Sequence, residues 1–259
     1  ASFAHRDELT DLADTFNDLL GRLEASVARE RRFTANAAHE LMNPLAALRS
    51  DAEVALRRPR TDEAYRDVLG RVVEESERMA ASVEGLLHLA RAEALARTPE
   101  ARIDLSALVL TRVERLSALA QAAGLTLTTD VDPGVRLAAQ PAPLVQIIDN
   151  LVENAVKYTP SGGSIRVSLT HRGKGAACSG AARLVVDDTG IGFDGEADRL
   201  FDRFYRSDAP GVQARPGTGL GLAVVKAVAE AYGGHVGCAS DGPGKGARFW
   251  AELPCVGEE

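Results

Sequence analysis

The chain has 259 residues, of which 45% are hydrophobic and 26% are charged, and it carries a net charge of −7 at pH 7. This composition predicts one or two folded domains, excludes extensive disorder and argues against a nucleic-acid-binding surface. The three cysteines, Cys178, Cys238 and Cys255, match no zinc or disulfide spacing, so we expect reduced intracellular thiols. No apolar run of about 18 residues occurs and the first residue is not methionine, so we expect a cytoplasmic fragment of a longer protein.

The first part of the chain, residues 7–95, is predicted to form long helices. Apolar residues recur every three or four positions in 7–30, which is typical of an amphipathic helix. Pro59 is expected to end one helix, and Thr61 or Asp62 to cap the next. Two long helices joined by a short turn form an antiparallel hairpin. Because such a hairpin cannot bury an apolar stripe on both helices, we expect a homodimer that forms a four-helix bundle.

The pattern changes after about residue 101, where shorter helices and strands alternate. The expected helices cover residues 105–124, 143–160 and 219–234, and the expected strands cover 125–131, 163–173, 182–190, 235–240 and 246–254. This order predicts a mixed α/β domain with glycine-rich loops.

The segment FTANAAHELMNPLAAL, residues 33–48, places one histidine on a predicted helix. At about 100° per residue, the apolar side chains form one stripe and His39 points away from it. The expected buried stripe is Ala37, Leu41, Leu45, Leu48, Ala52 and Ala55, and the polar neighbours of His39 are Asn36, Asn43 and Ser50. Pro44 removes one helical hydrogen bond near His39 and can bend the helix. Glu40 can orient or deprotonate the ring, and a neutral imidazole is a good nucleophile.

Two glycine-containing segments indicate a ligand with phosphates and a flat base. GTGLGL, residues 217–222, opens a helix, and backbone N–H groups at a helix N-terminus form an anion site. In DDTGIG, Asp188 follows a strand and precedes Gly190 and Gly192, so its carboxylate can bind an amino group on a base that the loop approaches closely. Taken alone, the first segment also fits a flexible loop and the second an ordinary turn.

A third segment, NLVENAVKY, carries polar side chains at helical spacing. Asn150, Asn154 and Lys157 lie on one side of the predicted helix. Amide oxygens suit Mg²⁺, and an ammonium group can contact a phosphate. The alternative is an ordinary polar helix face, so the order of these segments along the chain is more specific than any one of them.

FTANAAHELMNPL resembles the phosphoacceptor box of bacterial sensor histidine kinases, with Met42 and Asn43 where that family usually has Arg and Thr. The resemblance implies that His39 is phosphorylated with Glu40 as its base. It also associates Asn43, four residues after the histidine, with phosphatase activity. RDELTDLADTFNDLLGRLE, residues 6–24, resembles the second helix of a HAMP signalling module.

The later segments resemble, in order, the boxes of the ATPase fold that histidine kinases share with gyrase-type topoisomerases, MutL-type repair proteins and Hsp90 chaperones. LFDRFYRS, residues 200–207, matches the phenylalanine box, and a lid over the nucleotide would follow at 208–218. The resemblance implies that Asn154 holds Mg²⁺ with help from Asn150, and that Asp188 reads the adenine amino group. The implied nucleotide-binding residues are Asn150, Asn154, Lys157, Tyr158, Asp188, Gly190, Gly192, Phe201, Arg203, Gly217, Thr218, Gly219, Leu220, Gly221 and Leu222. Pro216 and Ala247 depart from the usual glycine and hydroxyl residue.

These observations predict a multidomain protein: an all-α hairpin in a dimeric four-helix bundle, then an α/β sandwich that binds ATP. We expect a HAMP-like helix over 1–30, a dimerisation and histidine phosphotransfer domain over 31–100, and a catalytic domain over 101–259. The resemblance implies ATP-dependent autophosphorylation, transfer to an aspartate of a response regulator, and phosphatase activity on that regulator. It also implies that the full-length protein sits in the bacterial cytoplasmic membrane through segments missing here. The alternatives are a catalytically weak dimeric scaffold that docks a regulator, and an ATPase of the chaperone or DNA-repair branch.

Overall fold

The computed structural model describes residues 16, 20, 21, 35, 37, 38, 41–57, 61–94, 102–172, 180–195, 197–213, 215 and 217–255. The chain divides into two compact units, Ala1–Met79 and Ala80–Glu259. Several residues singled out in the sequence, His39, Glu40, Asn36, Pro59, Pro216 and Cys178, lie outside the described residues, as does most of the predicted HAMP-like helix.

Two helices follow one another at the positions expected for a hairpin. The first covers residues 41–56 and continues through Pro44, and the second, α2, covers Asp62–Ala94. Thr61 caps α2, because the backbone N–H of Ala64 donates to its Oγ1 at 3.3 Å. Asp62 and Glu63 in the first turn and Arg91 in the last turn complement the helix dipole.

The expected apolar stripe on the first helix is only partly covered within one chain. Ala55 is buried at 8% exposure, and Leu41 and Leu48 are half-buried. Leu45 is 51% exposed and Ala52 is also exposed, so a single chain does not bury the whole expected stripe. These side chains are available to a further partner.

The α/β domain contains two sheets. Arg102–Asp104 (β1) and Arg136–Ala138 (β3) form a small antiparallel pair. The main sheet has five strands in the order β2-β4-β5-β7-β6, in which β2 and β4 are parallel and the other pairs are antiparallel. Its strands are β2 Thr126–Val131, β4 Ser164–Arg172, β5 Ala181–Asp188, β6 His235–Ala239 and β7 Ala247–Pro254.

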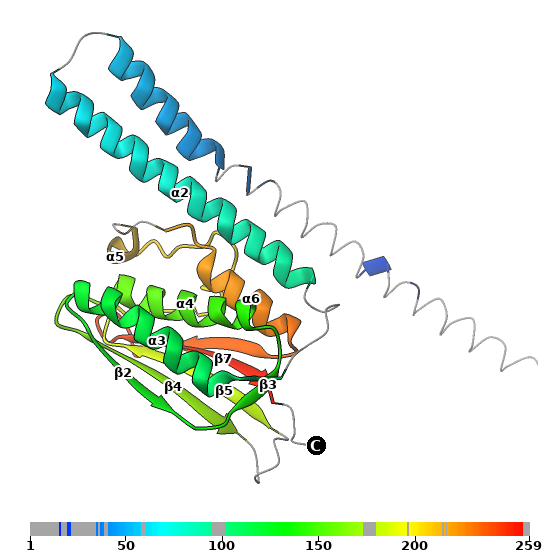
Figure 1. Ribbon diagram of the computed structural model, residues 1–259. Coiled ribbons are helices and arrows are strands. Elements are labelled where there is room, and N and C mark those ends of the chain that lie inside the picture. Colours follow the sequence, from blue (N-terminus) through cyan, green and yellow to red (C-terminus); the bar gives the residue numbers. More distant parts are fainter. Residues whose placement is uncertain are drawn as a thin grey trace, which may run out of the picture. The chain divides into compact units, whose positions relative to one another are not determined.

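Three helices cover one face of this sheet, as Figure 1 shows. They are α3 Leu105–Ala122, α4 Pro141–Tyr158 and α6 Gly221–Ala231. Strand β4 alternates, so Ile165, Val167 and Leu169 point into the core with no exposed surface. Burying such a side chain contributes about 1.5–3 kcal/mol, which favours this single arrangement of sheet and helices.

All the helices and strands predicted in the α/β domain are present, with small shifts at their ends. Strands β1 and β3 and the short helix α5, Pro210–Gln213, were not predicted from the sequence. Elements of three or four residues are too short to show either a helical or an alternating pattern of apolar residues, so tertiary contacts define them.

Candidate nucleotide-binding site

The C-terminal half of α4 forms one wall of a pocket in the α/β domain. Asn154, Lys157 and Tyr158 all line this pocket. The side-chain amide of Asn154 has no hydrogen-bond partner among the described residues, so its oxygen is available to a ligand. Pro160 cannot continue the helix, so α4 ends at Tyr158, and the backbone N–H of the C-cap residue Thr159 donates to the carbonyl of Ala155.

Asn150 also lines the pocket, and its amide nitrogen is bonded within α4. Its Nδ2 donates to the backbone carbonyl of Gln146 at 2.8 Å. Its Oδ1 faces the first residue of α6, and a Cβ placed at Gly221 would lie 2.6 Å from that oxygen. Glycine at this position therefore allows α6 to begin close against α4. Asn150 therefore lies against the start of α6, and its role as a second metal ligand stays a prediction from the sequence.

Asp188 ends strand β5 and lines the same pocket. Its Oδ1 accepts hydrogen bonds from the backbone N–H groups of Gly190, at 2.7 Å, and Ala247, at 3.2 Å. Burial raises the pKa of this carboxyl, although the two N–H groups oppose that shift. With Oδ1 held by two donors, Oδ2 is the oxygen available to accept from a ligand.

The predicted glycine loop lies at the N-terminus of α6. All residues from Gly217 to Leu222 line the pocket. The N-cap residue, Leu220, provides no side-chain cap for the first turn of α6, so the N–H groups there are available to an anion. Thr218 stabilises the loop, because its Oγ1 accepts from the N–H of Leu220 at 3.3 Å.

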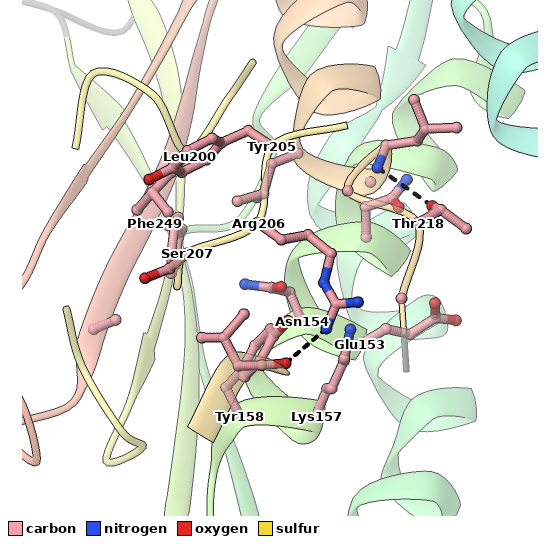
Figure 2. Close-up of a pocket in the computed structure, with 18 of the residues that line it drawn as sticks. Glu153, Asn154, Lys157, Tyr158, Leu200, Tyr205, Arg206, Ser207, Thr218 and Phe249 are labelled. Carbon is pink, nitrogen blue, oxygen red and sulfur yellow. Dashed lines mark hydrogen bonds between the residues drawn. The ribbon is translucent and has the colours of Figure 1, made fainter. Parts of the chain in front are cut away.

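Positively charged side chains converge in the pocket from two elements. Figure 2 shows Lys157 on α4 and Arg206 on the loop after β5 pointing toward the same space. The Lys157 ammonium lies 4.8 Å from the ring centroid of Tyr158, and the guanidinium carbon of Arg215 lies 5.8 Å from that centroid. Burial, and then repulsion by Arg206 and Arg215, lowers the pKa of Lys157 to about 8. A polyphosphate would relieve this repulsion.

The acidic side chains of α4 do not neutralise these cations. Asp149 is held by Arg112 of α3 through two bonds, Nε to Oδ1 at 3.0 Å and Nη2 to Oδ2 at 2.5 Å. Glu153 lines the pocket, and burial followed by the charge of Asp149 raises its pKa. Among the described residues, neither Asp149 nor Glu153 forms an ion pair with Lys157 or Arg206.

Arg206 also organises the segment predicted to be a lid. Its Nη2 donates to the backbone carbonyls of Val212, at 2.7 Å, and Arg215, at 2.5 Å. Within the same segment, Nε2 of Gln213 donates to the carbonyl of Ser207 at 3.0 Å. The Nε of Arg206 is buried and has no hydrogen-bond partner among the described residues.

The phenylalanine-box residues named from the sequence do not enter the pocket. Phe201 is 7% exposed and packs against Phe249 with ring centroids 6.3 Å apart, and neither it nor Arg203 lines the pocket. Gly190 supports Asp188 from outside the lining. Tyr205, Arg206 and Arg215 were not predicted from the sequence. The first two stand in the quoted motif LFDRFYRS, but no periodicity distinguishes them from Phe201 and Arg203.

Comparisons with known proteins agree with this arrangement. Residues 139–257 match the family described as "Histidine kinase-, DNA gyrase B-, and HSP90-like ATPase", and residues 29–95 match the "His Kinase A (phospho-acceptor) domain". The sensor protein IrlS of Burkholderia pseudomallei is 33% identical over 95% of this chain and 52% of its own length. The chain belongs to the sensor histidine kinases. It spans about half the length of the curated sensor kinases that it matches.

Solved sensor kinase structures share the fold. The histidine kinase ShkA, solved full-length with AMPPNP, matches 86% of this chain and 46% of its own chain, with 29% identity and a TM-score of 0.59. The histidine kinase ThkA, solved with the response regulator TrrA, matches 87% of this chain and 63% of its own chain, with 19% identity and a TM-score of 0.66. Among the described helices of this sensor kinase chain, none is both long enough and apolar enough to cross a membrane.

Proposed function

We propose that this sensor kinase chain uses ATP to phosphorylate His39 and then transfers the phosphoryl group to an aspartate of a response regulator. The observation that carries the proposal is the convergence of Lys157, Arg206 and the N-terminus of α6 on one side of a pocket that also holds Asp188. Cations and backbone N–H groups suit phosphates, and a carboxylate suits an amino group on a base. ShkA, with the same fold, was solved with the ATP analogue AMPPNP.

The residues of the pocket fit a bound Mg²⁺. Asn154 offers an amide oxygen that has no hydrogen-bond partner among the described residues. The described residues contain no cluster of three or more His, Cys, Asp or Glu that could hold a metal ion by itself. A magnesium ion held by one or two protein oxygens together with substrate phosphates matches such a site. Asn154 would hold the ion, which would neutralise charge on the phosphates of ATP. Asn150, whose Oδ1 lies beside the first residue of α6, would act chiefly by keeping α6 in place.

The reaction is a phosphoryl transfer in which the protein mainly positions and stabilises charge. A ring nitrogen of His39 attacks the γ-phosphorus, a nitrogen–phosphorus bond forms, and the bond to the ADP oxygen breaks. Glu40, next in the chain, takes the proton from the other ring nitrogen. Lys157 and Arg206 hold the phosphates where the charge develops. An aspartate carboxylate of the regulator then attacks the phosphorus, which regenerates His39.

The exposed surface of α2 fits the proposed homodimer. Large apolar side chains at Leu69, Val73, Val83 and Leu87 are each at least 42% exposed. Together with Ser76 and Ala80 they recur at spacings of four and three, which is the repeat of a coiled-coil seam. We therefore assign residues 31–100 to dimerisation and histidine phosphotransfer, residues 101–259 to ATP binding and catalysis, and residues 1–30 to a HAMP-like signalling helix.

The same chain is proposed to act as a phosphatase on the phosphorylated regulator. Asn43 is exposed on the helix that carries the phosphoacceptor box, beside Met42, which is 65% exposed. A neutral amide on this surface can hold a water molecule in line with the aspartyl phosphate of a docked regulator. ThkA, which shares the fold, was solved with its response regulator bound.

The direct test is incubation of the 259-residue chain with Mg²⁺ and ATP labelled at the γ-phosphate, followed by acid and base treatment of the product. We expect a label on the protein that is lost in acid and stable in base. His39→Gln should abolish it while ATP binding persists, and His235→Gln, at an exposed site on β6, should not change it. Full labelling of His39→Gln would refute the assignment of His39. ATP binding without any labelling would indicate the scaffold alternative.

A further inference from the structure

Ser240 follows strand β6, and its hydroxyl joins two loops that are far apart in sequence. The backbone N–H of Phe193 donates to Ser240 Oγ at 3.1 Å, and the N–H of Gly242 donates to it at 3.2 Å. The hydroxyl donates its own proton to the carbonyl of Gly246 at 2.7 Å, in preference to the carbonyl of Gly242 at 3.2 Å. One hydroxyl has one proton and two lone pairs, so these three bonds use its full capacity.

The two loops that Ser240 joins are those that hold Asp188. One loop provides the N–H of Gly190 and the other the N–H of Ala247, both of which donate to Asp188 Oδ1. The loops also bond directly to each other, because the N–H of Gly246 donates to the carbonyl of Gly190 at 3.1 Å. Gly246 accepts from Ser240 and immediately precedes Ala247. The hydroxyl therefore lies one residue from a donor that orients the carboxylate.

Gly192 packs directly against this hydroxyl. Its φ of +61° lies in the left-handed region, and a Cβ at this position would lie 2.8 Å from Ser240 Oγ and 3.0 Å from the Gly246 carbonyl oxygen. A side chain at position 192 would therefore push the loop that carries Gly190 and Phe193 away from Ser240. Gly192 also lines the pocket, whereas Ser240 does not.

We propose that Ser240 is a positioning residue that sets the preference of the site for adenine over guanine by fixing the direction of the Asp188 carboxylate. The inference rests on the proposed binding of ATP in this pocket. Adenine presents an amino group to a carboxylate where guanine presents a carbonyl oxygen. A site built to accept from an N–H rejects an analogue that lacks it, provided the acceptor is held rigidly.

The test compares the dissociation constants of ATP and GTP for the full chain and for Ser240→Ala. The substitution leaves the N–H groups of Phe193 and Gly242 and the carbonyl of Gly246 without their partner. The carboxylate then loses its fixed direction, so we expect the preference for ATP over GTP to fall about tenfold, the equivalent of one hydrogen bond. A general loss of protein stability would weaken the binding of ATP and GTP alike and would leave the ratio of their dissociation constants unchanged.

Ser106→Ala is the matched control. The Ser106 hydroxyl makes the same kind of link elsewhere in the domain, donating to the carbonyl of Asp132 at 2.7 Å and accepting from the N–H of Val135 at 3.0 Å. It is buried at 4% exposure and does not line the pocket. Its removal should lower the melting temperature without changing the ratio of the two affinities.

A second variant keeps the test valid if the alanine protein does not fold. Ser240→Cys keeps the size of the side chain but replaces the hydroxyl with a weak donor and acceptor, so the ratio should fall in the same direction by a smaller factor. An unchanged ratio in a folded Ser240 variant, or an equal fall in Ser106→Ala, would overturn the inference. If the unmodified chain bound neither ATP nor GTP, the proposed function itself would fail, and the inference with it.

Discussion

The guanidinium of Arg206 lies 2.5 Å from the backbone carbonyl oxygen of Arg215, nine residues further along the chain. A second bond from the same nitrogen reaches the carbonyl of Val212. These two bonds close the segment 206–215 into a loop beside Lys157. One side chain therefore both orders the lid segment and contributes positive charge to the pocket.

Replacing Arg206 by lysine should separate these two contributions. Arg206→Lys keeps the charge. The ammonium group is a single nitrogen on a flexible chain, so it cannot reproduce the planar geometry of the guanidinium. We expect faster amide hydrogen exchange at residues 207–213 and ATP affinity lowered about tenfold, as for one or two lost hydrogen bonds. Arg203→Lys is the control, since Arg203 does not line the pocket. Unchanged exchange in Arg206→Lys would exclude a role of Arg206 in ordering the lid segment.

Removing the carboxylate of Asp188 should weaken ATP and ADP equally, because both carry the same base. The loss expected for one charge-assisted hydrogen bond is about 1.5–3 kcal/mol, measured by calorimetry with each nucleotide. Asp187→Ala provides a neighbouring control, because Asp187 pairs with Arg248, at 2.5 Å, and does not line the pocket. Equal affinities for Asp188→Ala and the unmodified chain would contradict the proposed base site.

The two asparagines of α4 should differ in their dependence on Mg²⁺. Asn154→Ala should lower ATP affinity and turnover mainly when Mg²⁺ is present, because it removes an available oxygen ligand. Asn150→Ala should lower affinity by the same factor with and without Mg²⁺, because Asn150 contacts the start of α6. Titrations with ATP in Mg²⁺ and in EDTA measure both effects. A purely Mg²⁺-dependent defect in Asn150→Ala would restore the pair of metal ligands expected from the sequence.

Nucleotide binding should depend on pH through Lys157. The pKa of Lys157 is lowered to about 8 in the free protein, chiefly by burial and then by Arg206 and Arg215. A bound phosphate favours the charged ammonium and raises that pKa. Below pH 8 the lysine is already protonated and affinity should be flat. Above pH 8 binding must take up a proton, so affinity should fall, by at most about tenfold per pH unit.

Calorimetry at pH 8 in buffers of different ionisation enthalpy would detect this proton uptake directly. Lys157→Arg is the matched variant, because a guanidinium stays charged throughout this range. Its affinity should be independent of pH. If Lys157→Arg retained the full slope, the proton would have to enter at another group.

Substitution of Asn43 should change the rate of regulator dephosphorylation more than the rate of autophosphorylation. Asn43→Ala should largely keep autophosphorylation, because Glu40 is the proposed base, but it should slow dephosphorylation of the regulator. The measurement is the decay of phosphorylated regulator in the presence of each protein. Ser50→Ala, an exposed polar position two turns further on the same face, is the control. Equal decay rates for Asn43→Ala and the unmodified chain would favour a structural role of Asn43 beside Pro44.

The sequence alone was sufficient for the elements whose residues repeat with a clear period. Strand β4 alternates and α4 carries apolar residues every three or four positions, so both were predicted nearly at their observed bounds. Short glycine and amide motifs also predicted the pocket-lining positions of Asp188, Asn154 and Lys157. Motifs of a few residues were enough to single out these positions, whereas the roles of the three side chains toward a nucleotide stay predictions.

Only the tertiary structure decided which neighbouring side chains enter the pocket. Phe204 has a φ of 63°, and its N–H donates to the carbonyl of Gly219 at 3.0 Å, so the chain turns between Phe201 and Arg206. This turn leaves Phe201 in the core and places Arg206 in the pocket. Likewise, the pairing of Asp188 with Ala247 across β5 and β7 brings the Ser240 loop to the carboxylate. Contacts between residues so distant in sequence arise from sheet register and core packing, which have no local pattern.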